Sequence, residues 1–130
     1  MTETTATAKP LPQAADDPFD ALRAAAAHHH LLLENDRVRV LETLIPPGER
    51  TADHTHCWPS AQYICSWSDF IRRDGGGDVM LDSRTIKAPE IGAVLWSEPY
   101  PLHSVENIGT ADLRVIQVEI KPGNMSVLKA

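Results

Sequence analysis

The chain has 130 residues, a length typical of one compact domain. Its net charge of -6 argues against a surface that binds nucleic acid or an anionic membrane. No apolar run approaches the ~18 residues of a membrane span, and the first residues lack the basic start and apolar stretch of a secretory signal. We therefore expect a cytoplasmic protein, in which Cys57 and Cys65 are reduced, partly buried thiols rather than a disulfide framework.

The N-terminal part of the chain predicts a tail and one short helix. Residues 1–15 carry no periodic apolar face, so we expect them to be disordered. Asp17 is a suitable N-cap and Pro18 suits the first helical position, which predicts a helix that ends near His28. The chain then divides into residues 1–27, tail and helix, and residues 28–130, a single domain.

From residue 28 onward, short apolar runs alternate with turn residues about every ten positions. The predicted strands cover residues 31–33, 37–40, 62–73, 79–81, 93–96, 103–105 and 113–120. Pro46-Pro47-Gly48 and the glycines at 75–77 are typical turn sequences. In the last strand Ile116, Val118 and Ile120 lie on one face, and Gln117 and Glu119 on the other. This pattern predicts an all-β barrel or sandwich.

Three histidines are candidate metal ligands. His54 and His56 are two residues apart, and in a strand such residues point to the same side. His103 begins a later predicted strand, so it is able to reach the same point from a neighbouring strand. Imidazole is the commonest protein ligand for divalent transition metals, and three such ligands leave positions open for water or substrate.

Residues 48–107 resemble the two sequence motifs of the cupin superfamily. In the first motif a glycine is followed by five residues and then H-x-H, as Gly48 is by His54 and His56. In the second motif a glycine precedes a histidine that is followed by an asparagine, as in Gly92, His103 and Asn107. The stretch at residues 34–42 also resembles the opening of small one-domain cupins. The resemblance implies a double-stranded β-helix (jelly-roll) barrel.

The sequence departs from these motifs at four positions. Ser60 stands where the family has its glutamate ligand, and Trp67 where it has a glycine. Glu98 and Tyr100 replace the proline and glycine that precede the motif histidine. The resemblance therefore implies a three-histidine centre without a carboxylate, similar to the iron(II) cupins cysteine dioxygenase and β-diketone-cleaving dioxygenase.

Other side chains are candidates for supporting roles. Gln62 lies on the same strand face as Ser60, so it is either a fourth metal ligand or a hydrogen-bond partner of the site. Tyr100 and Glu98 are candidate catalytic residues, Glu98 as a general base. Trp96 is either a residue of the pocket mouth or a core or interface residue. We interpret the run at 28–30 as surface or dimer-interface histidines.

These observations favour an enzyme that binds a divalent ion (Fe, Zn, Ni or Mn) and acts on a small organic molecule by dioxygenase-like or Lewis-acid chemistry. The missing glutamate leaves two alternatives open: a cupin that binds a metal or ligand without turnover, and a cupin that has lost its metal. Because edge strands need covering, we expect a homodimer.

Overall fold

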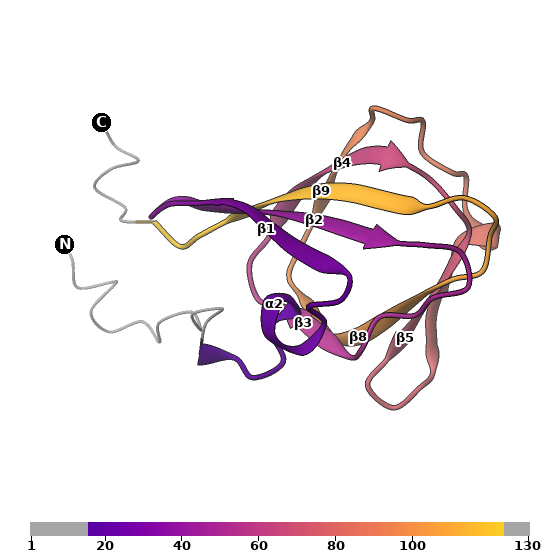
Figure 1. The fold of residues 1–130 in the computed structure, drawn as a ribbon, viewed down its shortest axis with the longest axis horizontal. Coiled ribbons are helices and arrows are strands. Elements are labelled where there is room, and N and C mark those ends of the chain that lie inside the picture. Colours follow the sequence, from indigo (N-terminus) through magenta and orange to yellow (C-terminus); the bar gives the residue numbers. More distant parts are fainter. Residues whose placement is uncertain (1–15, 124–130) are drawn as a thin grey trace.

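The short strands fold into two antiparallel sheets that face each other (Figure 1). The computed structural model describes residues 16–123, so the expected tail at residues 1–15 lies outside the described residues. In sheet order, the five-stranded sheet is β1 (His29–Glu34), β2 (Val38–Ile45), β9 (Leu113–Ile120), β4 (Ser60–Ser66) and β7 (Val94–Ser97). The four-stranded sheet is β3 (His54–His56), β8 (Tyr100–Asn107), β5 (Phe70–Asp74) and β6 (Val79–Asp82). The all-β prediction is confirmed.

The helical elements that lie wholly within residues 16–123 are short: α2 (Ala21–Ala24) and the 3₁₀ turn η2 (Ser83–Thr85). The predicted helix start at Asp17 is wrong, because Asp20 is the N-cap and its side chain accepts a hydrogen bond from the Leu22 amide. Asp17 instead accepts from the Phe19 amide and the Thr55 hydroxyl, which fixes the turn before the helix. The described residues contain no helix long and apolar enough to span a membrane.

The strand predicted over residues 62–73 is two strands in different sheets. β4 ends at Ser66, and β5 begins at Phe70 in the opposite sheet. At the corner between them, the Ser68 hydroxyl donates to Asn107 Oδ1 over 2.7 Å. The Asn107 amide nitrogen in turn donates to the carbonyl oxygens of Ile45 and Ala111, 2.8 Å from each. Apolar content does not locate such a corner, because apolar residues are buried on both sides of it, Ile64 on β4 and Phe70 on β5.

The interior between the sheets is apolar at one end and polar at the other. Ile45, Phe70 and Leu113 form the buried apolar cluster, with Trp67, Leu81 and Val105 packed against it. On β9 the face with Gln117 and Glu119 points inward, and their exposed fractions are 5% and 0%. The polar face of this strand is therefore the inner one, and it supplies buried hydrogen-bonding groups to the end of the barrel where the histidines lie.

Candidate metal centre

Four histidines from three strands converge at the polar end of the interior. His29 comes from β1, His54 and His56 from β3, and His103 from β8. One ring nitrogen each of His29, His54 and His56 lies within 4.8 Å of the other two. The ring centroid of His103 is 4.4 Å from that of His54 and 5.7 Å from that of His56. The pairing of β3 with β8, with His54 opposite His103, brings the two motif histidines together.

Backbone carbonyl groups fix the orientation of three of these rings. The Nδ1 atoms lie 3.0 Å from Ala25 O for His29, 2.7 Å from Ala52 O for His54, and 2.7 Å from Pro101 O for His103. A carbonyl oxygen only accepts hydrogen bonds, so each Nδ1 must carry the proton. In the neutral ring the lone pair then lies on Nε2, which is the form that binds a metal.

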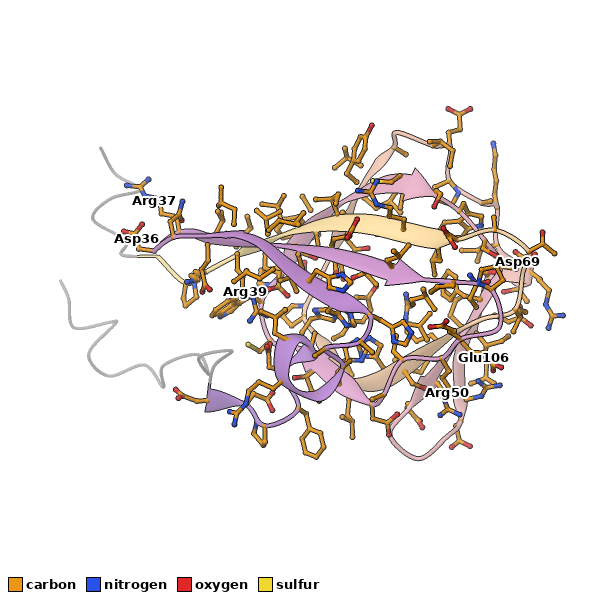
Figure 2. All side chains as sticks on the ribbon, viewed as in Figure 1. Asp36, Arg37, Arg39, Arg50, Asp69 and Glu106 are labelled. Carbon is orange, nitrogen blue, oxygen red and sulfur yellow. The ribbon has the colours of Figure 1, made fainter. Side chains whose placement is uncertain are left out.

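A buried chain of charged groups orients the fourth ring, that of His56. Its Nδ1 lies 3.0 Å from Glu119 Oε2, and Arg39 Nε donates to the other oxygen of this carboxylate over 2.6 Å. The Arg39 guanidinium also binds both oxygens of Asp20, at 3.0 and 2.8 Å. In Figure 2, Arg39 lies in the body of the molecule, whereas Asp36 and Arg37 lie at the far end of the β1–β2 hairpin. Such carboxylate–histidine pairs are typical of metal sites.

Electrostatics keep the four imidazoles neutral. Burial lowers the pKa of His29 and His56 well below the ordinary value, and the neighbouring histidines lower both further. Burial also lowers the pKa of His54, and it lowers that of His103 to about 3. Although burial opposes the charge of Arg39, its hydrogen bonds to Asp20 and Glu119 raise its pKa above the usual value. Burial raises the pKa of Glu119, against the opposing effect of Arg39.

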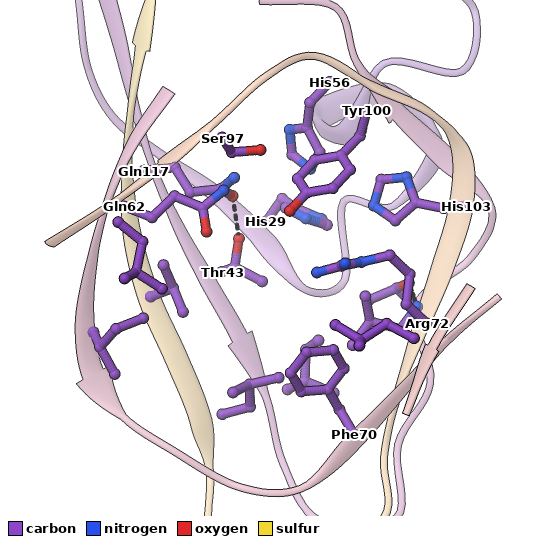
Figure 3. A pocket seen from close by; sticks show the side chains of 18 of the residues that line it. His29, Thr43, His56, Gln62, Phe70, Arg72, Ser97, Tyr100, His103 and Gln117 are labelled. Carbon is purple, nitrogen blue, oxygen red and sulfur yellow. Dashed lines mark hydrogen bonds between the residues drawn. The ribbon is translucent and has the colours of Figure 1, made fainter. Parts of the chain in front are cut away.

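The histidines form part of the wall of a cavity of about 240 Å³ (Figure 3). Phe70 lies at the apolar end of this cavity, and His56, Tyr100 and His103 lie around the other end (Figure 3). No aspartate or glutamate is among the described residues that line it, and Arg72 is the one lining side chain with a permanent charge. His29, His54 and His56 therefore fit a divalent transition-metal ion as neutral imidazoles with fixed tautomers, open on one side to the cavity, and His103 lies beside this group without belonging to it.

His29 corrects the interpretation of residues 28–30. We expected surface or dimer-interface histidines, but the exposed fraction of His29 is 3% and its ring contacts those of His54 and His56. His28 is also buried, with Nε2 2.8 Å from Glu49 Oε1, whereas His30 is exposed. The period of two in a strand pairs His28 with His30, but it does not say which face points inward. The leucines at 31–33 give no signal either, because they are exposed on both faces of the strand.

The other candidate residues take different positions. Gln62 and Tyr100 both line the cavity, and the Tyr100 ring centroid lies 5.0 Å from that of His103. The Gln62 amide lies 3.4 Å from the Ser60 hydroxyl, and Ser60 is buried on the same strand. Glu98 is exposed and is not among the lining residues; its carboxylate accepts a hydrogen bond from the Trp96 indole. The structure thus does not bring Glu98 to the histidines, while Trp96 lines the cavity and is 59% exposed.

Comparison with solved structures defines the fold class. The chain is similar to a cupin domain from Bordetella pertussis Tohama I, with a TM-score of 0.59 and 21% identity over 72% of this chain and 92% of that one. It is also similar to an RmlC-like cupin family protein with a double-stranded β-helix fold from Methanocaldococcus jannaschii (TM-score 0.52, 14% identity, 78% and 84% covered). An uncharacterized conserved protein with a double-stranded β-helix domain from Klebsiella pneumoniae gives a TM-score of 0.50 at 18% identity, with 90% and 93% covered.

The protein therefore has the double-stranded β-helix fold of the cupins, with a buried histidine cluster that could bind a metal ion. At these identities the similarity shows the fold alone. No protein-family profile matches the chain, and no curated protein sequence matches it.

Proposed function

We propose that this protein is a metal-dependent enzyme that acts on a small organic substrate at a centre formed by four histidines, His29, His54, His56 and His103. The observation that carries the proposal is the position of the histidines in the wall of a cavity, rather than in a closed shell. Structural metal sites are usually closed by protein ligands, whereas catalytic sites keep a position open. The cavity is smaller than the ~300–1,000 Å³ of pockets for drug-sized ligands, which favours a small substrate.

A bound ion such as Fe(II), Zn, Ni or Mn would supply Lewis-acid chemistry or, with iron, activation of dioxygen. The protein residues set the conditions for this chemistry. In each of the four imidazoles Nδ1 donates its proton to a carbonyl or carboxylate oxygen, so that Nε2 keeps a free lone pair for a metal ion. Gln62, Ser97 and Tyr100 offer polar groups to a substrate from the facing walls. Ile64, Phe70 and Leu113 exclude water at the apolar end.

The second candidate function is a non-catalytic metal- or ligand-binding module. The observation that favours it is the place of Glu98, the candidate general base, which points to solvent and contacts Trp96 instead of the cavity. Without this base, proton transfer at the site would depend on Tyr100 or on the histidines themselves.

Metal analysis and turnover together test the proposed function. The protein, purified without a histidine tag, is loaded in turn with Fe(II), Zn, Ni and Mn, and bound metal per chain is measured. We expect about one ion per chain, with a large loss in His54→Ala and His103→Ala and no loss in the exposed control His30→Ala. Metal-loaded protein is then assayed for oxygen uptake and for product formation with a panel of small organic acids, aldehydes and diketones.

The outcomes separate the two functions. Turnover that disappears in His103→Ala supports the enzyme. Metal binding without turnover across the panel favours the binding module. Equal metal content in the wild type and His54→Ala would exclude both functions at this centre.

A further inference from the structure

Arg72 is a partly buried cation without an anionic partner among the described residues. Its side chain lines the cavity from β5, and its Nε is buried without a hydrogen-bond partner. The guanidinium carbon lies 4.7 Å from the ring centroid of Tyr100 and 5.4 Å from that of Phe70. These ring contacts stabilise the charge in part, but they leave the buried Nε donor without an acceptor.

The next residue makes the contrast clear. Arg73 points to the other side of β5, and its guanidinium donates to Glu106 over 2.8 Å. Arg39, which is buried, binds two carboxylates. Withdrawing part of a charged group from water without an anionic partner is costly, so a partly buried arginine that lines a cavity indicates an anion that comes from outside the chain.

The cavity has no negative charge of its own to satisfy Arg72. Its described lining contains histidines, amides, hydroxyls and apolar side chains, but no carboxylate. Arg72 also acts on the histidines: its charge contributes to lowering the pKa of His56, after burial, His54 and Arg39, and that of His103, after burial and the neighbouring histidines. The guanidinium and the histidines therefore line the same cavity (Figure 3), and the Tyr100 ring lies near both Arg72 and His103.

We propose that Arg72 is a substrate-binding residue that holds a carboxylate group, so that the cavity takes a small organic acid whose other end faces the histidines. The guanidinium fork matches a carboxylate in two hydrogen bonds, which fixes orientation as well as charge. The apolar side chains around Phe70 contact the carbon chain of the acid. This inference deepens the proposed function and rests on the cavity being the site of that function.

Binding measurements with defined probes test the proposal. Acetate, malonate and 3-hydroxypropionate are titrated into the protein, with acetamide, malonamide and inorganic phosphate as comparisons, and binding is followed by chemical shifts of the Trp indole and Tyr ring signals. The variants are Arg72→Met, which keeps much of the volume, Arg72→Lys, which keeps the charge, and the matched control Arg73→Met. Thermal unfolding of each variant establishes that it is folded.

We expect at least one carboxylate to bind the wild type and Arg73→Met alike, and to lose roughly 10- to 100-fold in affinity in Arg72→Met, as is typical when a hydrogen bond to a charged group is lost. Arg72→Lys should lose less, and the amides should bind weakly. Equal carboxylate affinity in the wild type and Arg72→Met would overturn the proposal, as would amides that bind as well as the acids. Phosphate that binds more tightly than every carboxylate would overturn the assignment to an organic acid.

The same measurements in metal-free and metal-loaded protein distinguish this proposal from the proposed function. If the wild type takes up metal but no carboxylate binding depends on Arg72, the proposal that Arg72 binds a carboxylate is wrong, and the proposed metal centre is unaffected. If carboxylates bind through Arg72 but no ion binds at the histidines, the role of Arg72 is supported and the proposal of a metal-dependent enzyme is wrong.

Discussion

His56 and Glu119 share a hydrogen bond of 3.0 Å between Nδ1 and Oε2, at a position where the Glu119 side chain is fully buried. The other carboxylate oxygen is held by Arg39, so Glu119 has no freedom to follow a displaced ring. The orientation of a candidate metal ligand therefore depends on an ion pair that does not touch the metal position.

The first prediction concerns this pair. Glu119→Gln keeps the shape but removes the charge, so His56 loses a charge-assisted partner and Arg39 loses one of its two anions. We expect metal affinity to fall roughly 10- to 100-fold, the range typical for residues that orient ligands. Competition with a chromogenic chelator measures this affinity. Glu106→Gln, which disrupts an ion pair outside the cavity, should leave the metal affinity unchanged. An equal loss of affinity in both variants would show that the change in net charge, and not the orientation of His56, causes the effect.

The second prediction concerns His29 as a ligand. His29→Ala should weaken metal binding by more than the loss in Glu119→Gln, because it removes a donor atom rather than its support. His30→Ala is the matched control, since it changes the adjacent residue on the opposite face of β1. Isothermal titration with Zn measures both. If His29→Ala binds as tightly as the wild type, the centre consists of His54, His56 and His103 alone.

The third prediction concerns metal removal. An ion that binds only the folded state stabilises it by about 2.7 kcal/mol when its free concentration is 100 times the Kd. Thermal unfolding should therefore occur at a lower temperature after treatment with EDTA and recover on adding Zn. His54→Ala should show the same unfolding temperature with and without Zn; a Zn-dependent rise in that variant would place the stabilising ion elsewhere.

The fourth prediction concerns the turn after β8. A Cβ added at Gly109 would clash with the Ser68 hydroxyl oxygen and lie 2.9 Å from the Asp69 amide nitrogen. Gly109→Ala should lower the free energy of unfolding by ~1–3 kcal/mol, as expected for overpacking at a buried corner. Urea denaturation measures the loss. At Gly123 a Cβ has no atom within 4 Å, so Gly123→Ala serves as the control.

The sequence was sufficient for the fold class, because strand periodicity, turn residues and the cupin-like spacing agree. It also identified three histidines that the structure brings together through the pairing of β3 with β8. Metal binding by these residues and by Gln62, and the homodimer, stay predictions.

His29, Arg72 and Glu119 were beyond sequence reasoning for one shared reason. Each lies on a strand where alternation shows two faces without showing which face is inside. Apolar residues usually mark the inner face, but on β9 the inner face carries Gln117 and Glu119, and on β5 Arg72 faces the cavity. Burial of charged groups depends on partners distant in the chain, and these are visible only in three dimensions.

The distribution of the four histidines over the two sheets has a consequence for the order of folding. β1 belongs to one sheet, and β3 and β8 to the other, so no single hairpin contains the complete ligand set. Long-range strand pairing forms slowly, because the chain must first close large loops. The complete set therefore exists only after the two sheets have docked, and a stopped-flow record of metal uptake during refolding would time that docking event rather than the formation of any one hairpin.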